Sequence, residues 1–369
     1  PPIVTAFSGG IGEPNAPYLI STIVELNRIG HNPRLMSDHF QLSNDVDLAG
    51  VRLFSIGSSL FPFTGDFDGN GFTISNLSRT ADAGDANGVG LFNYVTGSAA
   101  IRNLNLFDST VEAGPRDYVG TLVGHLNGST LTDCHSWGTI VSGRRYVGGL
   151  IGYEVNGTIT RCSTSGAVTG DMGVGGLIGY CRGAVTDCSA TGTILGGDDI
   201  GGLVGCFDRP GAISSCCANG TVAGDNQVGG LVGSNIGTLR NSYAAAGVTG
   251  TSRVGGLVGR QYYRSLIACS YASGPVSGDA DLGGLIGYCE GGTITSAFWD
   301  VEASGLATSA GGMGLTTAEM MRAATFLEAG WDFVGEMDNG TEDLWWIDEG
   351  QDYPRLWFEA DGADVAEGP

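Results

Sequence analysis

The sequence predicts an all-β fold, a right-handed parallel β-solenoid with three short strands in each coil of about 27 residues. One observation is a glycine-rich hexapeptide, Val-Gly-Gly-Leu-Val/Ile-Gly, whose seven copies begin at residues 119, 147, 174, 200, 228, 254 and 282. Successive copies begin 26 to 28 residues apart, which is typical of stacked repeats. A second observation is that the chain between copies divides into pieces of five or six residues bounded by glycine. Such pieces are too short for helices and indicate strands.

Stacking places equivalent residues of successive coils in columns, and two of these columns are apolar. The second strand of the coils carries one of them: Leu131, Ile159, Val185, Ile213, Leu239 and Ile294. The third strand carries the other: Ile140, Val168, Ile194, Val222, Val248 and Val276. We expect both columns to face the interior of the coil.

The hexapeptide leaves two alternatives open. If Leu150 points inward, strict alternation along a strand turns Val147 and Ile151 outward. Either the Gly-Gly pair bends the strand at a corner and buries all three side chains, or the coils expose an apolar stripe suited to lateral association.

The nine cysteines follow the repeat. In earlier coils Leu77 and Leu104 occupy a slot at the end of the second strand that later coils give to cysteine, and free cysteine behaves as a small hydrophobe. The sequence therefore predicts a ladder of buried thiols: Cys134, Cys162, Cys188, Cys216 and Cys269. Cys181 and Cys206 follow the hexapeptide in adjacent coils and could form a disulfide. The absence of a Cys-x-x-Cys motif disfavours a thiolate metal site.

We expect four regions along the chain. Residues 1–50 form an N-terminal strand and a capping helix, since Ile23, Leu26 and Ile29 have helical spacing. Residues 51–118 form irregular first coils, and residues 119–297 form the seven repeats. Residues 298–369 form an aromatic-rich α/β cap with an acidic tail. A capping box from Thr316 to Glu319 predicts a helix in that cap that runs to about Leu327.

Charge and composition bear on location and partners. The net charge of −22 opposes nucleic-acid binding, and no apolar run is long enough to predict a transmembrane segment. The chain begins with Pro1 and Pro2, so we expect a mature form from which a signal peptide has been removed, placed outside the cell or on its surface. Five sequons are candidate glycosylation sites: Asn76, Asn127, Asn156, Asn219 and Asn339.

Few residues point to chemistry. Asp171, Asp198 and Asp225 recur every 27 residues, which predicts a carboxylate column able to bind calcium, the one cofactor we consider. Trp345 and Trp346 could form a platform for glycans, although tryptophans near a terminus more often fill the core of a cap. No catalytic residue is predicted, because the four histidines form no His-Glu-x-x-His motif and no nucleophile elbow is present.

The hexapeptide, followed by Gly157-Thr-Ile-Thr-Arg-Cys162 and Gly166-Ala-Val-Thr-Gly170, resembles the GLUG-repeat family. The repeat resemblance covers roughly residues 89–300, and the flanking segments Phe298-Trp-Asp300 and Tyr353-Pro-Arg-Leu-Trp357 extend it. Members of this family are modules of large bacterial surface and secreted proteins, including adhesins and the non-catalytic part of certain immunoglobulin-A peptidases. The resemblance is specific for architecture and implies no shared catalytic motif.

The sequence therefore favours a non-enzymatic extracellular solenoid with a structural or adhesive role, which could assemble into fibres or surface layers. Its expected partners are further copies of itself or surface glycans. Two alternatives remain: a carbohydrate-active β-helix enzyme, a polysaccharide lyase or hydrolase, and a glycan-binding module.

Overall fold

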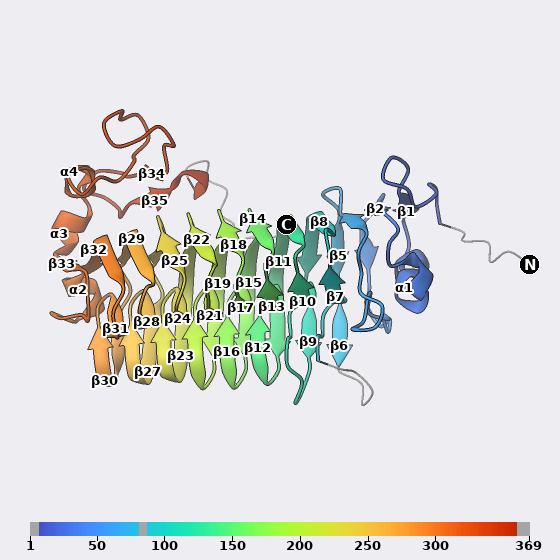
Figure 1. Ribbon diagram of the computed structural model, residues 1–369, viewed down its shortest axis with the longest axis horizontal. Helices are drawn as coiled ribbons and strands as arrows, with labels where there is room; N and C mark the ends of the chain where they lie inside the picture. The colour runs from blue at the N-terminus through green and yellow to red at the C-terminus, as the bar shows by residue number, and fades with distance from the viewer. Residues whose placement is uncertain (1–6, 81–86, 360–369) are drawn as a thin grey trace, which may run out of the picture.

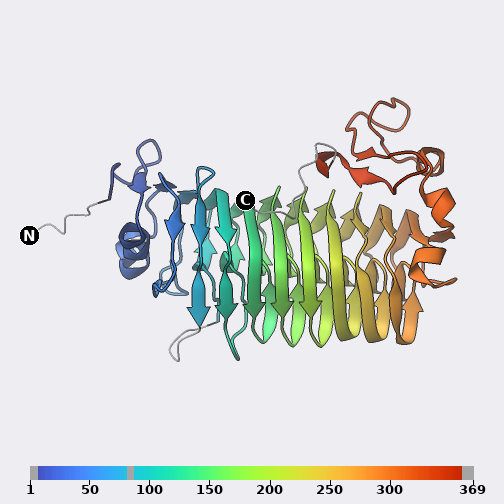
Figure 2. The same cartoon turned by 180° about the vertical axis from the view of Figure 1, so that it is seen from behind.

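The computed structural model describes residues 7–80 and 87–359. It is a parallel β-solenoid of about nine turns, which confirms the predicted fold class. Figures 1 and 2 show a straight rod in which each coil stacks on the one before it. The coil-to-coil pairings are parallel, and equivalent residues of the repeat are aligned, as in Val147↔Val174 and Ile151↔Ile178.

The hexapeptide is divided between two strands of the coil. Val147 is the last residue but one of β12 (Arg145–Gly148), whereas Ile151 begins β13 (Ile151–Val155). Val147, Leu150 and Ile151 are all fully buried. A Cβ atom on Gly149 would lie 2.1 Å from the carbonyl oxygen of Gly176, so only glycine lets adjacent coils approach at this bend. The predicted corner is confirmed, and the alternative of an exposed apolar stripe is wrong.

The strand that follows the bend forms a separate eight-stranded parallel sheet. Its strands are β7 (Phe92–Thr96), β10 (Val123–Asn127), β13, β17 (Ile178–Cys181), β21 (Val204–Phe207), β24 (Val232–Asn235), β28 (Val258–Gln261) and β31 (Ile286–Cys289).

The remaining strands of the coils wrap around the other faces as one continuous sheet. The face after the first turn contains β4 (Asp66–Asp68), β8 (Ala100–Phe107), β11 (Thr130–Ser142), β14 (Thr158–Thr160), β18 (Ala184–Thr186), β22 (Ala212–Ser214), β25 (Thr238–Arg240), β29 (Leu266–Ala272) and β32 (Thr293–Asp300). The last face and its return to the bend contain β5 (Thr73–Ser75), β6 (Ser78–Thr80), β9 (Thr110–Glu112), β15 (Ser163–Thr169), β16 (Met172–Gly175), β19 (Ser189–Leu195), β20 (Asp198–Gly201), β23 (Cys217–Gly229), β26 (Tyr243–Ala244), β27 (Gly247–Gly255) and β30 (Val276–Gly283).

Two apolar cores run along the rod. The larger contains Leu150, Ile151 and the second-strand column, in which Ile294 is only partly buried. The smaller contains Val147 and the third-strand column. One residue of that column was assigned wrongly: Ile140 is 51% exposed, and Val141 is buried in its place. The register shifts between Ser136 and Thr139, so that Val141 pairs with Val168.

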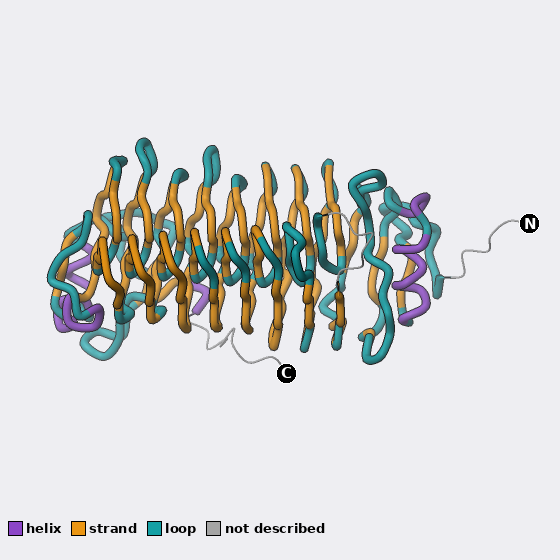
Figure 3. Tube along the Cα trace, turned by 90° about the horizontal axis from the view of Figure 1, so that it is seen from below, coloured by secondary structure: helices purple, strands orange, loops and turns teal. Residues whose placement is uncertain are grey.

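Helices lie at the two ends of the rod (Figure 3). The N-terminal helix α1 (Ile23–His31) opens with a capping box between Thr22 and Glu25, and it buries Leu26 and Ile29 against the first coils. Beside it lie β1 (Tyr18–Ile20), a 3-10 turn (Pro33–Leu35), β2 (Phe40–Leu42) and β3 (Val46–Asp47).

The C-terminal end begins with α2 (Val301–Ser304) and β33 (Met313–Leu315), which continues the sheet beside β32. The remainder, residues 317–359, is here called the C-terminal segment. Its elements are α3 (Thr317–Met320), α4 (Ala323–Leu327), β34 (Trp345–Trp346), β35 (Arg355–Leu356) and a 3-10 turn (Trp357–Glu359). The capping box of Thr316 and Glu319 is present, but the predicted helix is divided into α3 and α4. The segment folds back over the side of the rod (Figure 1).

Candidate functional site

One outward column of the rod packs, over part of its length, against the described residues of the C-terminal segment. Pairing aligns the residues of this column, here called the groove column: Asn105, His135, Ser163, Ser189, Cys217, Tyr243, Tyr271 and Phe298. Its last four residues pack against the C-terminal segment in a third apolar cluster with Phe326, Trp331 and Trp345. Over the earlier coils the column carries small or polar side chains, and a groove of about 230 Å³ opens beside them.

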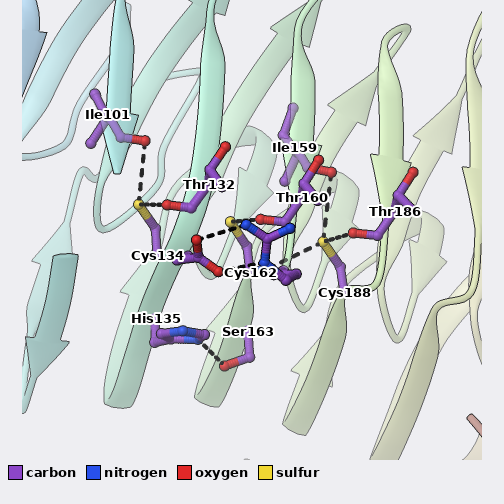
Figure 4. Close-up of polar contacts among 12 residues, drawn as sticks. Ile101, Thr132, Cys134, His135, Ile159, Thr160, Cys162, Ser163, Thr186 and Cys188 are labelled. Atoms are coloured by element: carbon purple, nitrogen blue, oxygen red, sulfur yellow. Dashed lines mark hydrogen bonds and ion pairs between the residues drawn. The ribbon is translucent and has the colours of Figure 1, made fainter. Parts of the chain in front are cut away.

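The inner wall of the groove is the corner that carries the cysteine ladder (Figure 4). Asp133, Arg161 and Asp187 precede the ladder with φ values of 53°, 50° and 55°. This left-handed conformation turns the chain so that the residue before the ladder faces outward and the cysteine faces inward. The same turn therefore buries the thiols and places charged side chains on the rim of the groove.

The thiols of the ladder are hydrogen-bonded as well as buried. The Sγ atoms of Cys134, Cys162 and Cys188 donate to the carbonyl oxygen two residues earlier, at 3.4, 3.4 and 3.2 Å (Figure 4). The predicted ladder is confirmed for these three residues and for Cys216, which are at most 1% exposed. It is wrong for Cys269, which has a φ of 47° and lies in the outward position, because the slot in its coil belongs to Ser270.

His135 and Ser163 form the floor of the groove. The His135 Nδ1 atom lies 2.8 Å from the Ser163 Oγ atom. Burial lowers the pKa of the His135 imidazole, so the ring is neutral at neutral pH. The Trp137 ring stacks with that of His135 at 5.5 Å between centroids, with 12° between the planes. These contacts fix the orientation of the imidazole.

Charged side chains line the rim. Arg161 donates two hydrogen bonds to Asp133, of 2.7 and 2.8 Å. The hydrogen bond from Arg161 lowers the pKa of the Asp133 carboxyl, although burial opposes this effect. Burial raises the pKa of Asp187, against a hydrogen bond from the Trp357 indole and the charge of Arg161. Phe358, from the C-terminal segment, closes the end of the groove.

This arrangement suits binding better than catalysis. Ser163 is 3% exposed, so its hydroxyl is not presented to a substrate as a nucleophile would be. The Asp133 carboxylate is engaged by Arg161 and has no hydrogen bond to His135 among those found in residues 7–80 and 87–359. A Ser-His pair without an orienting acid or an accessible hydroxyl lacks the geometry of a hydrolytic triad.

The predicted disulfide is wrong. All nine cysteines are free, and Cys206 pairs in register with Tyr180, whereas Cys181 pairs with Phe207. Successive residues of a strand point to opposite faces, so Cys181 lies in the large core and Cys206 faces outward. Inside the core the Cys181 Sγ atom donates to the Oε2 atom of the fully buried Glu154, at 3.2 Å.

The predicted calcium column is also wrong. Asp171 and Asp225 are aligned with Gly197, whereas Asp198 is aligned with Met172 and with Asn226. The three aspartates recur every 27 residues, but the coil between Val174 and Ile200 has only 26, so the column slips by one position. In the part of the chain that the structure describes, no group of three His, Cys, Asp or Glu side chains is arranged to hold a metal ion.

The two tryptophans proposed for glycan binding lie in the cap. Trp345 is fully buried in the third cluster, which contradicts its predicted role as a platform. Trp346 is half-buried, and its indole nitrogen donates to the carbonyl oxygen of Leu356 at 3.2 Å. The aromatic residue that lines the groove is instead Phe358, which the sequence alone did not single out; Trp357 lies beside it, and Trp137 stacks on His135.

The sequons differ in how accessible their amides are. Asn127 and Asn156 are exposed, and Asn219 is half-buried. The Asn76 side chain donates to Asp47 at 2.7 Å, and Asn339 donates to the carbonyl oxygens of Leu327 and Trp331. Glycosylation of all five remains a prediction, with Asn127 and Asn156 in the most favourable positions.

Comparison with known proteins agrees with this architecture, which is that of a repeat β-solenoid. Residues 170–195, one complete coil, match the family described as "The GLUG motif". The predicted resemblance to GLUG-repeat proteins is thereby confirmed. No helix within the described residues is both long enough and apolar enough to cross a bilayer.

Two relatives match about a third of this chain. Halomucin of Haloquadratum walsbyi is 36% identical over 140 residues, which are 36% of this chain and 2% of halomucin. A "Putative Gly-rich membrane protein" of Evansella cellulosilytica is 35% identical over 131 residues, which are 33% of this chain and 14% of that protein. This chain therefore spans only a small part of each relative.

A solved structure shares the fold over almost the whole chain. It is the crystal structure of a "putative immunoglobulin A1 protease" from Bacteroides ovatus, with a TM-score of 0.57 over 95% of both chains. Its sequence is 21% identical, so the likeness establishes the fold alone.

Proposed function

We propose that this chain is a non-enzymatic module of an extracellular or cell-surface protein, a stiff rod that spaces and presents an adhesive surface. The observation that carries the proposal is the continuous stack of about nine coils around two closed cores. In such a stack each coil contacts only its neighbours, which gives a long body with large lateral faces. The net charge of −22 favours solubility.

The relatives support the proposed location. One is named halomucin and another a membrane protein, and each matches about a third of this chain. A rod of this kind needs no catalytic centre, and the groove beside His135 and Ser163 has a geometry that suits binding better than catalysis.

Self-association has less support than a solitary rod. Lateral assembly through an apolar stripe is not available, because the hexapeptide is buried. At the C-terminal end, β30 pairs with β27, and its outer edge is exposed from Ser277 to Asp281. Carboxylates on an edge strand oppose the addition of further strands, and Asp279 and Asp281 lie on this edge.

Negative-stain microscopy and light scattering of the purified chain test the structural part of the proposal. We expect monodisperse rods. Protease treatment of intact source cells tests the location, and we expect the chain to be cleaved without lysis. Protection of the chain until lysis would contradict an extracellular location, and fibres would contradict the solitary rod.

A hydrolase is the second candidate, because His135 and Ser163 form a short hydrogen bond. A fluorophosphonate reagent, which labels nucleophilic serines, decides between the two. We expect no labelling of the wild-type chain. Labelling that is lost in Ser163→Ala would overturn the non-enzymatic proposal.

A further inference from the structure

The groove beside Ser163 and Ser189 continues the surface on which the C-terminal segment packs. Farther along the groove column, Tyr243 and Tyr271 fill the same position under the C-terminal segment. Phe358, from the same segment, forms one wall of the groove. The change from tyrosine to serine therefore leaves a space of about 230 Å³ beside Phe358.

The charges around this space disfavour an ionic ligand. The Arg161 guanidinium is already matched by Asp133, in a bidentate pair. Asp187 adds a further carboxyl, and the chain as a whole carries a net charge of −22. An anion would be repelled by this field. A cation would need converging acidic ligands, and no such group of three exists in residues 7–80 and 87–359.

The lining combines apolar and hydrogen-bonding surfaces. The ring of Phe358 supplies an apolar wall, and Trp357, which is 43% exposed, stands beside it with 89° between the two rings. The lining also includes the hydrogen-bonded side chains of Asp133 and Arg161 and the hydroxyl of Ser189. A matching ligand has an apolar face and an edge of hydroxyl groups, which is the chemistry of a sugar ring.

We infer that this groove binds one ring of a neutral saccharide, such as the end of a glycan chain, between Phe358 and the Asp133–Arg161 pair. The space is smaller than the roughly 300–1,000 Å³ of pockets for drug-sized ligands, so it accommodates a single ring. Asp187 and Ser189 supply hydrogen bonds to ring hydroxyls, and the neutral His135 holds the floor. The inference deepens the proposed adhesive function, on which it rests, by giving it a site and a ligand class.

Saturation-transfer NMR on the full chain tests this inference. The probes are methyl glycosides of glucose, galactose, mannose and N-acetylglucosamine, with glucuronic and N-acetylneuraminic acid as anionic comparisons. We expect at least one neutral glycoside to bind and the two acids to bind more weakly. Chemical shifts of the Ser189 amide and the Trp357 indole should report the same binding. Absence of binding by all the neutral glycosides would overturn the inference.

Three variants locate the site. Ser189→Tyr fills the groove with the side chain that this column already carries at Tyr243 and Tyr271, so we expect affinity to fall more than about ten-fold. Phe358→Ala removes one stacking wall and should weaken binding about three- to ten-fold. Tyr288→Ala is the control, because Tyr288 is a partly exposed aromatic residue on another face.

Circular dichroism confirms that each variant is folded. Undiminished binding by folded Ser189→Tyr would overturn the inference. The proposed function and the saccharide site can be tested separately. A rod at the cell surface that binds no neutral glycoside would refute only the saccharide site. Binding of a neutral glycoside by a chain that is found inside the cell would refute only the proposed location.

Discussion

The main-chain N–H of Cys162 donates a hydrogen bond to the Sγ atom of Cys188 in the next coil, at 3.4 Å. Farther along the rod, the N–H of Cys216 donates to the Ser242 hydroxyl at 3.1 Å, and that of Ser242 donates to Ser270 at 3.2 Å. The ladder slot therefore needs a side chain that accepts from the preceding coil. The sequence indicated its burial, but a small hydrophobe alone would leave these N–H groups unpaired.

Replacement of Cys188 tests the hydrogen bond separately from burial. In Cys188→Ala the N–H of Cys162 loses its acceptor inside the core, which we expect to lower the free energy of unfolding by about 1–3 kcal/mol. Cys188→Ser retains an acceptor of the kind that Ser242 and Ser270 provide, so its effect should be below about 1 kcal/mol. Urea denaturation followed by circular dichroism measures both, and equal losses in the two variants would contradict the role of the hydrogen bond.

The hexapeptide glycines give a second, sterically defined test. A Cβ atom at Gly202 would lie 2.1 Å from the carbonyl oxygen of Gly230 and 2.9 Å from the Cβ atom of Ala218. Gly202→Ala should therefore destabilise the rod by about 1–3 kcal/mol, since coils would have to separate. The thermal unfolding midpoint measures the loss.

Gly247 is the matched control for Gly202. A Cβ atom there would approach nothing closer than 3.6 Å, and the same column already holds Thr193 and Thr221. Gly247→Ala should leave stability unchanged or raise it by about 0.4–1 kcal/mol. If both glycine variants were equally stable, the close approach of coils would not explain why glycine recurs at the bend of each repeat.

The coil could be predicted from the sequence because the hexapeptide that defines it is repeated. A change of register within one coil could not be predicted, because it occurs only once. Seven copies of the hexapeptide define the period, so Val168 and Val248 were placed correctly in the interior. Ile140 was misplaced because one coil carries an extra residue near Gly138, which has a φ of 66°. Asp198 was assigned to the wrong column because the prediction used the spacing between aspartates. The coil from Val174 to Ile200 has only 26 residues, so strand pairing aligns Asp198 with Met172.

The groove could not be predicted, because it depends on where the C-terminal segment packs on the rod. Ser163 and Ser189 resemble any other outward serines until pairing aligns them with Tyr243 and Tyr271. Phe358 is distant in sequence from every other residue that lines the groove. Aligning this column coil by coil would have been the useful signal, because it shows the change from tyrosine to serine beside the groove.

Trp345 should be essential for attachment of the C-terminal segment. Its ring lies 4.6 Å from that of Trp331 and is fully buried. Trp345→Ala should reduce the stability of this contact by about 3–5 kcal/mol, as truncation of large core side chains does. We expect much faster proteolysis within residues 317–359, with the coils left intact. Trp357→Ala is the control, and equal protection of the two variants would contradict a structural role for Trp345.

The same attachment should depend on pH through Glu359. Burial raises the pKa of this carboxyl, against hydrogen bonds from the Tyr243 hydroxyl, at 2.6 Å, and from the Leu356 N–H, at 2.8 Å. The attached segment therefore holds the proton more tightly than the detached one. As pH rises above the ordinary glutamate value of about 4.3, the attached state should lose stability until pH exceeds the raised pKa.

Tryptophan fluorescence during thermal unfolding measures this dependence, because five of the six tryptophans lie beyond residue 298. In Glu359→Gln the side chain is always neutral, so we expect the decline with pH to be reduced. Glu328→Gln, which removes an exposed carboxylate from the same segment, should retain it. Because Glu359 adjoins Phe358, loosening of this turn should also open the end wall of the groove. Attachment that strengthened as pH rose through this range would show that the carboxylate, and not the acid, is the bound form.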